Sequence, residues 1–249
     1  MSVPTLRLAL AGAVLALALP VGAMAQSAPV PTVDELVKAM TDTLAGATSI
    51  SFHVEKMFDD VLVTGEKIQY AGALDVAMRR PDRFHFSYGD DLSAKEAWYD
   101  GTQLLLLDLR AGVYGKLPAE ATIDATLDVV AEKYDVRMPL AGLMSSDAYA
   151  VFTAKAVEQR YIGLHDVDGV AAHHIFFSDE TVDWQLWIDA GEVPLPLKLV
   201  VTHADEPGEP QSIFLFTEWD LEADLPDDTF TPQIPEGAAL AAFLPRQGE

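Results

Sequence analysis

The sequence predicts an α+β protein built on a meandering antiparallel sheet of about ten to eleven strands. Three observations lead to this fold class. Apolar and polar residues alternate in many short segments that end at turn residues. Helical periodicity is limited to one segment near the start and one in the middle of the chain. Strands and helices do not alternate along the sequence, as they would in a doubly wound parallel sheet.

Residues 1–25 have the features of a secretory signal peptide. Arg7 precedes the apolar stretch Leu8 to Leu19, and Ala23-Met24-Ala25 supplies small residues for cleavage after Ala25. The apolar stretch is too short to span a membrane comfortably. We therefore expect export to the periplasm, followed by a disordered tail over residues 26–31. The chain contains no cysteine, so we expect neither a lipid anchor nor disulfides.

The first helix is predicted from Thr32 to Ala45, with Gly46 ending it. Thr32 and Glu35 have the spacing of a capping box, in which each side chain bonds the other's backbone N–H. Apolar residues then recur at helical spacing, at Val33, Leu36, Val37, Met40 and Leu44. A helix with one apolar stripe must lie on another element.

The first group of strands follows this helix. Segments 50–56 and 67–80 read as strands, and Phe84, Phe86 and Tyr88 alternate with polar residues in the next one. Asp100-Gly101 has the sequence of a tight turn and joins segments 97–99 and 104–107. One face of this sheet is therefore aromatic.

A helical insert interrupts the strands over about residues 120–153. It contains the periodic segment 122–134 and two shorter pieces, 139–144 and 146–152, with Ser146 as a candidate cap of the last. Strands resume at 161–165, 169–177, 182–189, 195–201 and 211–221. Phe230 in the closing segment is expected to tuck against the sheet.

Several short motifs occur in the same order as in a known family. They are Arg80-Pro81-Asp82-Arg83-Phe84, Tyr99-Asp100-Gly101-Thr102-Gln103-Leu104, Gln185-Leu186-Trp187-Ile188-Asp189, Pro194-Leu195-Pro196-Leu197-Lys198 and Phe230-Thr231-Pro232. Their order resembles that of the LolA/LolB periplasmic lipoprotein carriers, and most of all a branch of uncharacterised predicted periplasmic proteins. The resemblance implies a single LolA-like domain over residues 32–249. This domain would be a strongly curved, unclosed half-barrel with the insert as its lid.

The resemblance also implies a hydrophobic cavity between sheet and lid. Arg80, before the strand proline, matches the arginine that holds the lid shut; alternatively it is an edge arginine paired with an acid. The residues that we expect to line the cavity could equally form a filled core. They are Phe52, Val54, Val76, Met78, Phe84, Phe86, Trp98, Leu105, Trp184, Leu186, Phe214 and Phe216.

Charge and motif content exclude several functions. A net charge of −23 repels nucleic acid and anionic lipid headgroups, and it serves solubility or attracts a basic partner. His173 and His174 are adjacent on a strand and point to opposite faces, so we expect no metal site and no cofactor. Ser145, Ser146 and Ser178 lie in no Gly-x-Ser-x-Gly setting, so we do not expect an enzyme.

These observations favour a monomeric periplasmic protein that binds a lipid or the acyl chain of a lipidated protein. Such a carrier would pass its ligand to an outer-membrane or periplasmic protein. Two alternatives remain open: a sensor or interaction module of the same fold, and a hydrolase that acts on lipids.

Overall fold

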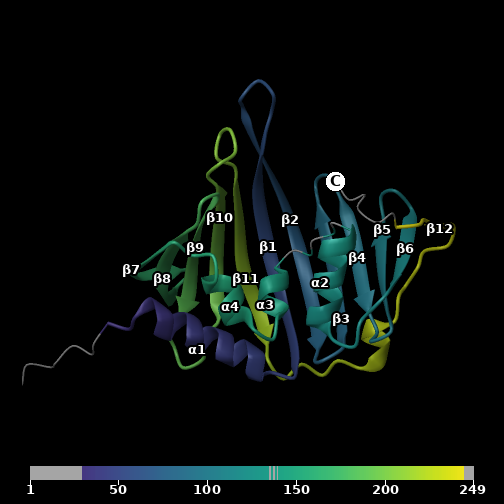
Figure 1. Ribbon diagram of the computed structural model, residues 1–249, viewed down its shortest axis with the longest axis horizontal. Coiled ribbons are helices and arrows are strands. Elements are labelled where there is room, and N and C mark those ends of the chain that lie inside the picture. The colour runs from purple at the N-terminus through teal and green to yellow at the C-terminus, as the bar shows by residue number, and fades with distance from the viewer. Residues whose placement is uncertain (1–29, 135, 137, 139, 244–249) are drawn as a thin grey trace, which may run out of the picture. The chain divides into compact units, whose positions relative to one another are not determined.

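A single sheet organises the chain (Figure 1). The computed structural model describes residues 30–134, 136, 138 and 140–243, and the residues from Pro31 onward form one compact unit. The strand order is β12-β6-β5-β4-β3-β2-β1-β11-β10-β9-β8-β7. The two outermost strands, β12 and β7, do not pair with each other, so the sheet is unclosed. The predicted α+β class is confirmed.

The strands follow the alternating segments of the sequence. Consecutive strands pair antiparallel from β1 to β6 and from β7 to β11, and β1 pairs with β11, which joins these two groups. Their bounds are β1 Ser49–Val61, β2 Lys67–Arg79, β3 Arg83–Asp90, β4 Ala94–Tyr99, β5 Gln103–Asp108, β6 Val113–Pro118, β7 Glu158–Val167, β8 Val170–Ser178, β9 Val182–Asp189, β10 Pro196–His203, β11 Gln211–Asp220 and β12 Ala239–Leu240.

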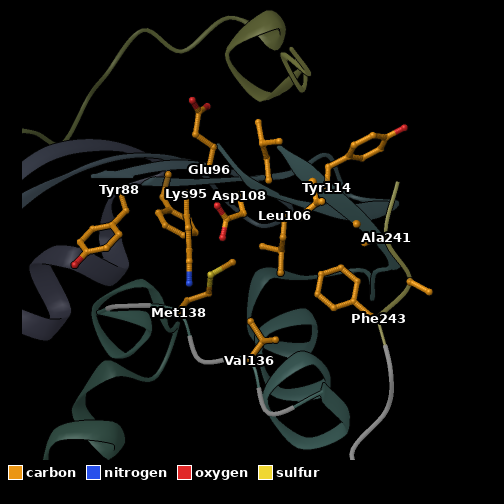
Figure 2. A pocket seen from close by; sticks show the side chains of 15 residues that line it. Tyr88, Lys95, Glu96, Leu106, Asp108, Tyr114, Val136, Met138, Ala241 and Phe243 are labelled. Carbon is orange, nitrogen blue, oxygen red and sulfur yellow. The ribbon is translucent and has the colours of Figure 1, made fainter. Parts of the chain in front are cut away.

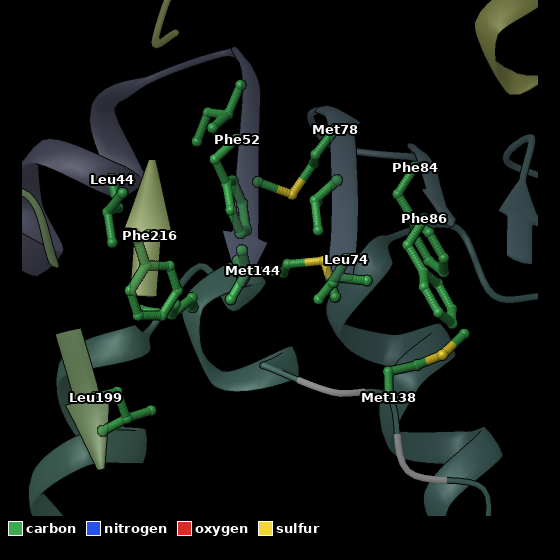
Figure 3. Packing of buried hydrophobic residues seen from close by; sticks show 14 of the residues in the cluster. Leu44, Phe52, Leu74, Met78, Phe84, Phe86, Met138, Met144, Leu199 and Phe216 are labelled. Carbon is green, nitrogen blue, oxygen red and sulfur yellow. The ribbon is translucent and has the colours of Figure 1, made fainter. Parts of the chain in front are cut away.

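Four helices pack on one face of this sheet, which we call the covered face (Figure 1). They are α1 Val33–Gly46, α2 Ile123–Tyr134, α3 Ala141–Met144 and α4 Ala148–Thr153. Buried side chains from these helices and from the strands form one core (Figure 3). The short 3₁₀-helix η1, Asp227–Phe230, follows β11 and buries Phe230.

The α1 helix begins as the sequence predicts. The Thr32 side chain accepts a hydrogen bond from the Glu35 N–H, while Glu35 accepts one from the Thr32 N–H at 2.8 Å. Val37 and Met40 on its apolar stripe are completely buried. The cap fixes where the helix starts, and the stripe fixes which side meets the sheet.

The structure corrects three details of the prediction. The sheet has twelve strands, and β12 pairs with β6 in parallel, so the sheet is not purely antiparallel. Asp147, rather than Ser146, caps α4, because its side chain accepts the Ala150 N–H at 3.1 Å. The Asp100 turn extends to Thr102, since β4 ends at Tyr99 and β5 begins at Gln103. The predicted signal peptide lies outside the described residues.

Candidate functional site

Two cavities adjoin the covered face, and only the larger one is lined by residues of the helices. The smaller, of about 380 Å³, is lined by side chains from β3 to β6 and by the segment that follows β12, including Tyr88, Leu106 and Phe243. The larger, of about 550 Å³, lies under α2, α3 and α4 and against β9, β10 and β11. Both volumes fall within the range of sites that hold small molecules, about 300–1,000 Å³.

Val136 and Met138 line both cavities. Both residues follow α2 and lie across the smaller cavity from the sheet. Figure 2 shows the side chains of Leu106 and Phe243 extending into the same space. Met138 is 7% exposed and belongs to the main core. The two cavities are therefore neighbours that share a wall of two apolar side chains.

The predicted cavity residues fall into separate groups. Phe86 lines the smaller cavity, and Trp184 and Phe214 line the larger one. The largest group is instead packed in the core and lines neither cavity (Figure 3). Its members are Phe52, Val54, Val76, Met78, Phe84, Leu186 and Phe216.

Trp98 and Leu105 do not belong to the cavity set. Tyr99, not Trp98, pairs with Phe84 and shares its face, and the same register places Leu104 and Leu106 on the covered face. Trp98 and Leu105 instead form a separate cluster with Leu107 on the opposite face. The error is one residue of strand register, which exchanges the two faces because side chains alternate along a strand.

Sequence reasoning also missed several cavity residues. Tyr88 continues the alternation of Phe84 and Phe86, and that signal was present in the sequence. Leu106 sits in a run of four leucines, where alternation is invisible and only the pairing identifies its face. Met138 and Phe243 reach the cavity from segments without strand or helix periodicity. No local pattern could have identified them.

Arg80 connects the sheet to the helices. Its Nη1 donates to the carbonyl oxygen of Met144, the last residue of α3, at 3.0 Å. Its Nε and Nη2 are buried without a hydrogen-bond partner among the described residues. Burial lowers the pKa of Arg80, while Asp124 acts in the opposite direction. The salt-bridged edge arginine of the alternative interpretation is not seen in the described part of the chain.

The aromatic side chains at the cavities enclose one lysine. Lys56 on β1 donates to the hydroxyl of Tyr88 at 3.4 Å, and its Nζ lies 4.3 Å from the ring centre of Phe58. The rings of Tyr88 and Phe214 follow at 5.3 and 5.9 Å. Burial lowers the pKa of Lys56, partly offset by Asp90.

The histidines are arranged on the sheet without a metal cluster. His173 and His174 point to opposite faces. The His174 ring stacks on Trp187, with ring centres 3.9 Å apart. The Nδ1 atoms of His174 and His165 are 3.0 Å apart. Within the described residues, no three His, Cys, Asp or Glu side chains are grouped closely enough to hold an ion. Among the same residues, no helix has the length and hydropathy to cross a membrane.

A family model described as "Predicted periplasmic protein (DUF2092)" matches residues 33–244, so the chain belongs to this family. The predicted relation to a branch of predicted periplasmic proteins is thereby confirmed. The family description also agrees with the expected localisation. A search of curated proteins gave no match.

Several crystal structures are similar to this chain at low sequence identity. An uncharacterized conserved protein from Thermus thermophilus has a TM-score of 0.49 at 12% identity, over 84% of this chain and 97% of that chain. The lipoprotein LppX from Mycobacterium tuberculosis has a TM-score of 0.44 at 12% identity, over 77% and 96%. A LolA superfamily protein from Nitrosomonas europaea has a TM-score of 0.36 at 10% identity, over 82% and 99%.

Proposed function

We propose that this protein binds acyl chains of a lipid, or of a lipidated protein, in the two cavities and carries them through the periplasm. One observation supports the proposal: two cavities remain open on the covered face, and most of the side chains that line them are apolar. Each buried methylene contributes about 0.8 kcal/mol. A long chain therefore needs no ionic contact to bind.

Mass spectrometry of the protein isolated from the periplasm tests this function. Native spectra should show an added lipid mass that solvent extraction removes. Leu106→Asp should reduce the bound lipid, because it places a charge in the apolar wall of the smaller cavity. A bound polypeptide would favour the interaction module instead. A protein that carries no lipid and takes up none from vesicles would contradict the proposal.

We further propose that Arg80 holds the helices closed over the cavities. Its single hydrogen bond to the end of α3 supports this role, because the sheet and the helix must separate there for a chain to enter. Nε and Nη2 of Arg80 are buried without partners among the described residues, which costs free energy in the closed form. Opening would expose both nitrogens to water, and this gain favours the open form. Arg80 would then set a closed state that can still open.

The neighbouring arginine supplies a matched control for this role. Arg79 also donates to a backbone carbonyl, that of Leu225, at 2.9 Å, but this bond joins it to the segment after β11 rather than to α3. Arg80→Leu should speed the exchange of bound lipid with vesicles, whereas Arg79→Leu should leave the rate unchanged. Equal rates in both variants and the wild type would contradict the latch.

A further inference from the structure

Lys56 is a cation placed on the apolar, covered face of the sheet. Residues of even number in β1 share this face with Phe52 and Val54, which are buried in the core. Lys56 pairs with Gly72 on one side and with Phe214 on the other. An ammonium group in such surroundings has lost part of its hydration, and it gains from any anion that reaches it.

The surroundings of Lys56 compensate its charge only in part, through Asp90. No carboxylate of the described residues lies within 4.0 Å of its Nζ, and its one hydrogen bond in that part of the chain goes to the hydroxyl of Tyr88. Asp90, the nearby acid, is already engaged. It accepts the Tyr88 hydroxyl and the N–H groups of Leu92 and Ser93. Although burial would raise the pKa of Asp90, these hydrogen bonds lower it.

The backbone of β3 approaches β2 closely at the position opposite Lys56. Gly72 faces Lys56 across the strand pair, and a Cβ at Gly72 would lie 2.5 Å from both Asp90 Cβ and the Gly89 carbonyl oxygen. This position therefore cannot carry a side chain without shifting β3. The close approach of β3 brings Tyr88 beside Lys56, where it supplies the neighbouring wall.

Lys56 also lies between the two cavities. The Tyr88 ring beside it lines the smaller cavity, and the Phe214 ring beside it lines the larger one. Lys95 adds a second ammonium group at the wall of the smaller cavity, where it extends between the sheet and Met138 (Figure 2). The same wall also carries Glu96 and Asp108. Lys56 itself lines neither cavity, but it lies beside a wall residue of each, and no carboxylate of the described residues lies within 4.0 Å of its Nζ.

We propose that Lys56 binds the anionic headgroup of a two-chain phospholipid whose acyl chains enter the two cavities. This inference rests on the proposed function and names the class of lipid. The net charge of −23 opposes adsorption to an anionic membrane surface. Lys56 can still select a single headgroup, because its contact is short-ranged and partly shielded from water. The protein would thus favour anionic lipids without adhering to the membrane that contains them.

Uptake of trace labelled lipids tests this inference. Phosphatidylglycerol and phosphatidylcholine with identical acyl chains are each placed in phosphatidylcholine vesicles, so that the surface charge stays nearly equal. The wild type should retain phosphatidylglycerol about tenfold better, the effect of one charge-assisted hydrogen bond. Lys56→Met should abolish this preference and still retain both lipids, and Lys56→Arg should keep most of it.

Lys198 provides the matched control. It is half-buried like Lys56 and lies 4.8 Å from the ring centre of Trp187, but it belongs to the opposite face of the sheet. Lys198→Met removes the same charge and should leave the preference intact. The Lys56 ammonium resonance of the wild-type protein should also shift with phosphatidylglycerol and not with phosphatidylcholine, a readout that requires no variant.

The outcomes separate the two proposals. Equal retention of both lipids by the wild type and by Lys56→Met would overturn the role of Lys56 and leave acyl-chain binding standing. Retention of neither lipid would overturn the proposed function itself. If inorganic phosphate alone removes the preference at concentrations comparable to the lipid, the site binds free anions, and the headgroup assignment is wrong.

Discussion

Each face of the sheet carries a lysine beside aromatic rings, but the surroundings of the two lysines differ. On the covered face, Lys56 lies among Phe58, Tyr88 and Phe214 beside open cavities. On the opposite face, Lys198 lies over Trp187, which stacks on His174. There His174 is hydrogen-bonded at both ring nitrogens, to His165 and to Gln185 at 3.1 Å.

The difference comes from what covers each face rather than from composition. On the covered face, the side chains of the strands do not completely fill the space beneath the covering segments. Space therefore remains there for a ligand. The opposite face satisfies its aromatic and polar groups among themselves, through stacking and hydrogen bonds within the sheet. A cation and an aromatic ring therefore indicate a binding site only where unfilled apolar volume adjoins them.

The largest loss of stability is expected from a substitution in the packed part of the covered face. Phe84 is completely buried and lies against Tyr99, with ring centres 5.5 Å apart. Phe84→Ala should lower the free energy of unfolding by about 3–5 kcal/mol, since it leaves a hole in the core. Phe214→Ala should cost much less, because Phe214 is half-buried at a cavity. Chemical denaturation measures both, and equal losses would mean that no cavity adjoins Phe214.

Leu105 and Leu106 compare the two faces directly. Leu105 is 1% exposed in the cluster on the opposite face, whereas its neighbour Leu106 is half-buried at the smaller cavity. Leu105→Ala should cost about 2–5 kcal/mol of stability and leave lipid affinity unchanged. Leu106→Ala should cost less stability and weaken lipid binding. Denaturation and lipid titration of both variants would refute the assignment of faces if the two effects were exchanged.

A smaller effect is expected at the cap of α1, which holds part of the helical cover. Thr32→Ala removes the side-chain acceptor for the Glu35 N–H and should cost about 1 kcal/mol in unfolding free energy. Thr32→Ser keeps the acceptor and should stay close to the wild type in the same measurement. A loss in Thr32→Ser as large as in Thr32→Ala would show that the capping hydrogen bond is not responsible.

The smallest effects are expected at two histidines, His174 and His53, whose contributions to the pH dependence of stability have opposite signs. Burial lowers the pKa of His174, so its folded form disfavours the proton. Its contribution to stability is complete above the ordinary histidine pKa and is lost as the pH falls from there through the lowered folded value. Denaturation midpoints between about pH 5 and pH 8 should therefore depend less on pH in His174→Gln.

His53 serves as the matched opposite. The hydrogen bond to Asp75, at 2.6 Å, raises the pKa of His53. Its contribution is complete below the ordinary histidine pKa and is lost as the pH rises through the raised folded value. His53→Gln should thus change the same pH series in the opposite direction to His174→Gln. Changes of the same sign would contradict the roles given to these two residues.

The sequence alone determined which segments form which elements. The capping box at Thr32 and Glu35 set the start of α1, alternation marked the strands, and the periodic segment 122–134 appeared as α2 within one residue. These features depend on neighbours along the chain, which the sequence displays directly. The face of Phe84 and Phe86 also followed from alternation.

Only the tertiary structure decided which side chains border open space. Trp98 and Tyr99 are adjacent aromatics, and the pairing of Tyr99 with Phe84 decides which of them faces the helices. Phe52 and Phe214 are both aromatic residues of the covered face, yet one is packed and the other borders a cavity. Whether a side chain is packed or borders a cavity depends on the distance between segments that are far apart in the sequence. The same apolar residue types line a filled core and a ligand pocket, so residue type alone does not distinguish the two.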